Sequence, residues 1–403
     1  MRDYMRPSYG NRHEPFSADC YADSFNATFL PGIAAAPDRT SGNATTPYDL
    51  SVKLPATSTL LEYLIAPNPS PALVQRIAAE RSQHSHFWFD IRNLRSWTDF
   101  NVNTISMIPG LLQLLQIPIP THALAAPGHV SQTPETHAQL HDICRDHHAV
   151  KVNAALRVAQ GTTHMALRSL EATPGSLQQP EFVSNYKSDH EKTIYGDGRG
   201  RVVGVVKCFD QWNSGMRAES PAQRVKYLHG LAHLHRFMRE HGCRYGFIMT
   251  EIELVCVRCG GPPPSTGNDV PLFGFLELAA PIQMATHGLR SGFPVPPTDY
   301  HRPSTGPCRV DGSDIQMTAT LALFYLHMLA KESPLPGQYG WRLDVGGPAA
   351  LTRQYHLDRD DWIPKPNLSE KREAKRSRGW VWPDEKLNRR ECGRGKRTAR
   401  AAS

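Results

Sequence analysis

The sequence has no apolar run long enough to cross a bilayer, although it extends over 403 residues. Its longest apolar helical stretch, Met317 to Ala330, covers about 14 residues and includes His327, whereas a membrane-spanning helix needs about 20. The first residues, Met1-Arg-Asp-Tyr, lack the apolar segment of a secretory signal peptide. We therefore expect no membrane partner, no secretion, and a nuclear or cytoplasmic location.

A disulfide framework is also missing. The eight cysteines are scattered along a long chain rather than spaced as in a small secreted scaffold, so we expect reduced thiols. Cys256 and Cys259 form an isolated Cys-x-x-Cys pair, and because zinc requires four ligands, buried thiols are the expected outcome. His229 and His233 lie one helical turn apart, but without the Glu of a His-Glu-x-x-His motif they indicate a polar helix face.

Positive charge is concentrated at the end of the chain. The segment 371–403 holds twelve of the 45 basic residues and four of the 38 acidic ones, a net charge of +8, whereas the whole chain carries +7. Such a block is typical of a solvated tail, a nuclear-import signal or a nucleic-acid contact. Trp380 and Trp382 within it suit base stacking, or docking of the tail onto the domain.

The chain divides into five parts by composition. Prolines and polar residues dominate the first part, which we expect to be disordered, and regular apolar patterns occupy the middle. The expected parts are a disordered segment 1–50, a helical and aromatic segment 51–134 packing on the core, an α/β core domain 135–332, an irregular extension 333–370 and the basic tail 371–403.

Local patterns predict the secondary structure. The segment 57–65 and the segment that Ser70-Pro71 begins are expected to be helices, because Ser at the N-cap and Pro at the first helical position favour a helix start. The dense aromatic run 87–91 is expected to be a strand. Residues 105–115 form a helix that Pro109-Gly110 interrupts, and residues 135–160 form a longer one.

The core has the clearest pattern. Residues 201–209 are apolar on both faces, as in a buried strand. Ser220, Pro221 and Gln223 form a capping box for a helix that ends at Gly242. The remaining core elements are expected to be a possible strand at 164–170, strands or a hairpin at 244–258, a strand at 273–278 and a helix at 318–331.

The order of these elements predicts an α/β (α+β) protein with a central mixed sheet flanked by helices. The sequence helix, strand, possible strand, strand, helix, strand, with Lys207 at the end of a buried strand, resembles the αβββαβ core of PD-(D/E)XK nucleases. The resemblance implies an acid on one strand and an acid-x-Lys on the next, which hold Mg²⁺ or Mn²⁺ and orient the attacking water. The candidates for catalysis are Asp189, also the candidate metal ligand, and Lys207.

The acid two residues before Lys207 is absent, because position 205 is Val. Glu251 and Glu253, on a later element, and Glu135, on the preceding helix, are candidates to replace it. Lys207 at the end of an edge strand, or paired with a nearby acid, is the structural alternative. The kinase interpretation is excluded, since no Gly-rich loop precedes the strand and no His-Arg-Asp or Asp-Phe-Gly follows it.

Three long runs, together with the Trp380-Val-Trp-Pro motif, resemble a family of filamentous-fungal proteins without an established activity. The runs begin at Phe89, Val203 and Cys243, and the resemblance covers roughly residues 50 to 390. Members sometimes carry the label sialidase. This chain has no Asp boxes of the form Ser-x-Asp-x-Gly-x-Thr-Trp and no propeller repeats, so sialidase activity is not expected.

Three functional hypotheses follow. The first is a non-catalytic or degenerate nuclease-like protein that binds nucleic acid, through the basic tail, or protein partners. The second is a metal-dependent phosphodiesterase that uses Asp189 and Lys207 with Glu251 or Glu253. The third is a protein-interaction scaffold that uses the aromatic segment 87–97 and the tail.

Overall fold

The computed structural model describes residues 57–77, 86–108, 110–170, 179–193, 196–259, 274–286, 315–331 and 359–377. The predicted disordered segment 1–50, most of the extension 333–370 and the Trp380–Trp382 motif lie outside these residues. Among the described helices, none is both long enough and apolar enough to cross a membrane. The five cysteines in the described residues are buried and form no disulfide.

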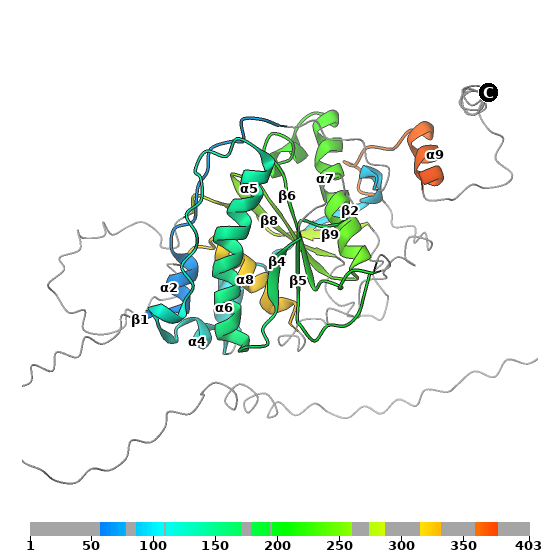
Figure 1. Ribbon diagram of the computed structural model, residues 1–403. Helices are drawn as coiled ribbons and strands as arrows, with labels where there is room; N and C mark the ends of the chain where they lie inside the picture. The colour runs from blue at the N-terminus through cyan, green and yellow to red at the C-terminus, as the bar shows by residue number, and fades with distance from the viewer. Residues whose placement is uncertain are drawn as a thin grey trace, which may run out of the picture. The chain divides into compact units, whose positions relative to one another are not determined.

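A mixed eight-stranded sheet forms the centre of the fold (Figure 1), which confirms the predicted class. Seven strands run in the order β2-β9-β8-β7-β6-β5-β4, and β10 pairs with β8. Their bounds are β2 Asn93–Ser96, β4 Ala166–Ser169, β5 Phe182–Asn185, β6 Val202–Val206, β7 Tyr245–Met249, β8 Glu253–Cys259, β9 Phe275–Leu278 and β10 Ile282–Gln283. A separate two-stranded sheet pairs β1 (Thr57–Thr59) with β3 (Pro118–Pro120).

The middle of the sheet contains the predicted order of helix, three strands, helix and strand. β4, β5 and β6 pair antiparallel in sequence, and after α7 (Pro221–Glu240) the chain returns as β7, parallel to β6. The helix before β4 is continuous through α5 (His137–Ile143), a π-helical turn (Cys144–Ala149) and α6 (Val150–Gln160). A parallel β6–α7–β7 unit brings the carboxyl ends of β6 and β7 to one edge of the sheet.

Helices cover both faces of this sheet (Figure 1). On one face lie α5, α6 and α8 (Ala319–Leu329), and on the other lies α7. The strand β6 serves both layers: Val202 and Val206 pack toward α6 and α8, and Val203 and Val205 pack toward α7. This placement explains why β6 is apolar at every position except Gly204.

The segment 51–134 does more than pack on the core. Its strand β2 joins the sheet beside β9, which is a parallel pairing. The aromatic run is not a strand as predicted, because Trp88–Asp90 forms a 3-10 helix and the strand begins at Asn93. The other helices of this segment are α2 (Leu60–Ile65), α3 (Val102–Met107) and α4 (Leu111–Leu115), and a further 3-10 helix spans Thr121–Ala123.

The helix predicted from Ser70-Pro71 does not form over the described residues 71–77, which are irregular apart from an isolated β-bridge between Arg76 and Thr136. At α7, Pro221 does occupy the first helical turn, but the Ser220 side chain makes no capping hydrogen bond. The basic tail is not irregular from its start, because Leu368–Ser377 forms α9, in which Ala374 is buried.

Candidate functional site

The predicted site residues are distributed around the ends of β6 and β7. Lys207 directly follows β6, and its N–H donates to the Met249 carbonyl at 2.9 Å, which joins the ends of the two strands. Glu251 lies two residues beyond β7, and Glu253 begins β8. The structure therefore brings Lys207, Glu251 and Glu253 to the same end of the sheet.

Asp189 lies elsewhere, at the other end of β6. Its two carboxylate oxygens accept hydrogen bonds from Arg201 at 2.6 and 2.7 Å, and Tyr186 N–H donates to it at 3.0 Å. Arg201 precedes β6 and Lys207 follows it, and six residues of strand extend over about 20 Å. The expectation that Asp189 and Lys207 form one metal-dependent centre is therefore corrected: Asp189 belongs to a buried ion pair.

Glu251 and Glu253 hold loop backbone. Glu251 accepts from Val74 N–H at 2.9 Å and from Phe209 N–H at 2.7 Å, and only 2% of the residue is exposed. Glu253, 3% exposed, accepts from the Ser214 N–H at 2.6 Å and from its hydroxyl at 2.8 Å. Both carboxylates thus fix the loop that follows β6.

The sequence analysis missed the acid that does lie beside the end of β6. Glu181 precedes β5, and β5 pairs antiparallel with β6, so the start of one strand faces the end of the other. The Val206 N–H donates to the Glu181 carboxylate, and His137 Nε2 lies 3.3 Å from it. The signal in the sequence was Pro180-Glu181 directly before an apolar strand, which resembles the Pro-Asp of the nuclease motif more closely than Asp189 does.

Glu181 and Lys207 influence different neighbours. His137, the partner of Glu181, begins α5 on one face. Lys207 acts on the histidines next to α7: burial lowers the pKa of His86 to about 2, and the charges of His229, Arg236 and Lys207 contribute to this shift.

Those histidines form a stacked group. The rings of His86 and His229 have centroids 4.5 Å apart, and those of His86 and His233 are 4.7 Å apart. Burial lowers the pKa of His233 far below its usual value, with Lys207 adding to the effect, so His233 is neutral. In the part of the chain that the structure describes, no three His, Cys, Asp or Glu residues are arranged to hold a metal ion.

The pKa of the Cys208 thiol responds to the charged groups at this end of the sheet. Its pKa is raised to about 11, chiefly by burial, while Glu251, Asp210 and Glu181 also raise it and Lys207 lowers it. The acids thus remain near the end of β6, although none of those described here forms a metal cluster. The Cys256 and Cys259 thiols are buried in β8, as expected from the isolated pair.

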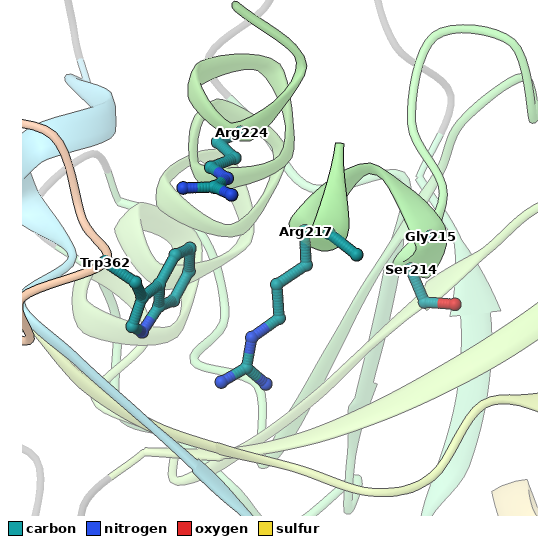
Figure 2. Close-up of a pocket in the computed structure, with 6 residues that line it drawn as sticks. Ser214, Gly215, Arg217, Arg224 and Trp362 are labelled. Carbon is teal, nitrogen blue, oxygen red and sulfur yellow. The ribbon is translucent and has the colours of Figure 1, made fainter. Parts of the chain in front are cut away.

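A pocket of about 360 Å³ opens next to this loop (Figure 2). The 3-10 helix Ser214–Ala218 forms one wall, the first turn of α7 supplies Arg224, and the segment before α9 supplies Trp362. The Arg217 guanidinium lies 4.9 Å from the centre of the Trp362 ring. The residues lining the pocket are Ser214, Gly215, Arg217, Ala218, Arg224 and Trp362.

The walls of this pocket are anchored by carboxylates from the core. Glu253 binds Ser214, as described above, and Asp360 binds β2 through the Leu94 N–H at 2.9 Å and the Asn93 amide at 2.9 Å. Burial alone would raise the pKa of Asp360, but these hydrogen bonds, with that from Arg95, outweigh burial and lower it. The position of Trp362 is therefore tied to the edge of the sheet.

Comparison with known proteins assigns neither a family nor a function to the chain. No family model matches the chain, and neither the curated proteins nor the solved structures include a match.

Proposed function

We propose that this chain is a degenerate nuclease-like protein that binds nucleic acid without cleaving it. The order α6-β4-β5-β6-α7-β7, with three antiparallel strands and a parallel return, supports the nuclease-like part of the proposal. The block of positive charge after residue 371 supports nucleic acid as the partner. The buried, reduced cysteines are consistent with a nuclear or cytoplasmic location.

The commitment of the acids to partners within the protein is the observation that carries the non-catalytic part. A nuclease of this type needs its acids and its Lys around one metal ion and one attacking water. Here the Glu181 carboxylate accepts from the Val206 N–H and lies 3.3 Å from His137 Nε2, and Asp189 pairs with Arg201. Glu251 and Glu253 have become anchors for the loop after β6.

A metal-dependent phosphodiesterase using Mg²⁺ or Mn²⁺ is the second candidate. It is favoured by the acids that remain near Lys207, since Glu181 and Glu251 both influence Cys208. The third hypothesis, a scaffold that presents the aromatic segment 87–97, has less support. Trp88 and Trp97 are only 7% and 3% exposed, so these rings stabilise the core rather than offer a docking surface.

The decisive experiment combines binding and cleavage. The full chain is incubated with labelled single-stranded and duplex DNA and RNA, with Mg²⁺, Mn²⁺ or a chelator. We expect retarded but intact nucleic acid under all three conditions. Metal-dependent cleavage that disappears in Lys207→Ala would instead establish the phosphodiesterase, and absence of any binding would leave a protein-interaction role.

The contribution of the tail is measured separately. A chain that ends at Ser377 retains α9 and loses eight basic and three acidic residues. Because phosphate contacts release counterions, binding through these residues falls steeply as salt rises. We expect the shortened chain to bind more weakly and with a shallower salt dependence than the full chain.

A further inference from the structure

The pocket beside the loop after β6 has a lining suited to an anionic, planar ligand. Arg217 and Arg224 contribute two guanidinium groups, Trp362 contributes an indole, and none of the described residues that line the pocket carries a carboxylate. Figure 2 shows the side chains of Arg224 and Trp362 on one side and that of Arg217 extending below them. Guanidinium groups bind phosphate in bidentate fashion, and aromatic rings stack on nucleobases regardless of sequence.

We propose that this pocket binds a nucleoside phosphate, either free or as one nucleotide of a single strand. In this arrangement the phosphate contacts Arg217 and Arg224, and the base packs against Trp362. The volume of about 360 Å³ falls within the range of small-molecule pockets, which is about 300–1,000 Å³. This pocket would supply one contact in the proposed binding of nucleic acid. The inference rests on that proposed function only where the ligand is one nucleotide of a single strand, and a free nucleotide does not require it.

The guanidinium groups are not committed to acids. Arg224 Nε donates to the Glu219 carbonyl at 3.0 Å, which orients the side chain and leaves its terminal nitrogens for a ligand. Arg217 packs against the indole. Among the ion pairs between described residues, none involves either arginine.

The walls are also set before a ligand arrives. Glu253 fixes Ser214 through two hydrogen bonds, and Asp360 fixes the Trp362 segment to β2 through the Leu94 N–H and the Asn93 amide. A rigid site loses less conformational entropy on binding. Glu253, a candidate replacement for the missing nuclease acid, therefore acts as a positioning residue for the pocket.

The test uses the full chain and two probes, 5′-AMP by calorimetry and a fluorescein-labelled dT12 by anisotropy. Arg217→Ala and Arg224→Ala are each expected to weaken 5′-AMP binding by roughly tenfold or more, since each removes a charge-assisted hydrogen bond. Trp362→Phe retains binding and Trp362→Ala loses it. Arg157→Ala is the matched control, because Arg157 is an exposed arginine of α6, on the other face of the sheet.

The two probes distinguish the sources of the ligand. Variant-sensitive binding of 5′-AMP supports a free nucleotide site, and variant-sensitive binding of dT12 alone supports a site for one nucleotide of a strand. The proposal is overturned if Arg217→Ala and Arg224→Ala bind both probes as the Arg157→Ala control does, or if inorganic phosphate competes as well as 5′-AMP. If a chain ending at Ser377 no longer binds dT12 but still binds 5′-AMP, the tail is required for binding the strand and the pocket binds the nucleotide without it.

Discussion

At the scale of single residues, Asp189, which the sequence presented as a candidate for chemistry, is accounted for by its buried ion pair with Arg201. The side chains are 8% and 1% exposed, and the guanidinium also lies 4.7 Å from the centre of the Tyr186 ring. Asp189 and Arg201 thus support the loop between β5 and β6, and their role is structural.

Replacement of Asp189 by Ala is expected to destabilise the fold by about 3–5 kcal/mol, because Arg201 would remain as a buried charge without its partner. Urea unfolding of the two proteins measures this difference. Arg76→Ala provides the control, since its ion pair with Glu135 is 78% and 54% exposed and such pairs contribute at most about 1 kcal/mol. An Asp189→Ala protein as stable as Arg76→Ala would contradict the structural role.

The sequence grouped Asp189 and Lys207 in one hypothetical centre with Glu251 or Glu253, but only Lys207, Glu251 and Glu253 lie at the same end of the sheet. Spacing along the chain admitted Asp189 as readily as Glu181, since both precede Lys207 by fewer than thirty residues. Only the register of β5 against β6, in which Phe182 faces Gly204, shows that Glu181 lies beside the end of β6. Register depends on the whole sheet, and a single strand does not specify it.

At the scale of elements, α7 packs closely against the loop after β6. The Trp212 indole donates to the Tyr227 carbonyl at 3.0 Å and stacks on the Tyr227 ring at 5.7 Å. A Cβ added at Gly230 would overlap the Trp212 ring. Gly230 therefore allows α7 to approach the segment that leads to the pocket.

Gly230→Ala is expected to destabilise the protein by about 1–3 kcal/mol, the range for overpacked cores. Helix propensity alone predicts the reverse, a gain of about 1 kcal/mol. Urea unfolding decides between the two, and Ala222→Gly at an exposed position of the same helix measures the propensity alone. A Gly230→Ala protein more stable than the parent would show that α7 and Trp212 are not in close contact.

Elements with a clear apolar pattern in their own sequence were predictable. Elements whose backbone is fixed by hydrogen bonds to distant segments were not. The strand β6 and the helices α6, α7 and α8 followed from apolar periodicity and caps. The expected helix after Ser70 fails because its backbone bonds to other segments: the N–H groups of Ala72 and Arg76 donate to Gln132 and Glu135. Such long-range partners override a local capping signal.

At the scale of the whole molecule, burial lowers the pKa of several histidines among the described residues. His327 is an example: its ring contacts the Leu323 carbonyl at 2.6 Å and the Ser184 hydroxyl at 2.7 Å, and burial lowers its pKa to about 4. The histidines with lowered pKa are His86, His141, His147, His148, His233, His235, His241 and His327.

These histidines make the protein acid-labile. Below about pH 6.5 the unfolded chain takes up protons that the folded chain excludes, so stability is fully present above that pH and falls as pH decreases. The loss from each group is at most about 1.36 kcal/mol per pH unit, and for His147, His241 and His327 it levels off below their folded pKa of about 4.

Urea midpoints between pH 8 and pH 4 measure this dependence. His327→Gln is expected to reduce the slope below pH 6.5, whereas His122→Gln, at an exposed site, is expected to leave it unchanged. A midpoint that does not change from pH 7 to pH 5 would contradict the neutral state of the buried histidines.

The central claim is that the acids around the end of β6 hold backbone and side chains in place of a metal ion. Titration of the full chain with Mn²⁺, followed by electron paramagnetic resonance, tests it most directly. We predict no stoichiometric Mn²⁺ site in the parent protein, and the same weak background in Glu181→Gln and Glu251→Gln. One Mn²⁺ bound per chain, lost in Glu181→Gln but retained in Arg157→Ala, would contradict the claim and restore the metal-dependent phosphodiesterase.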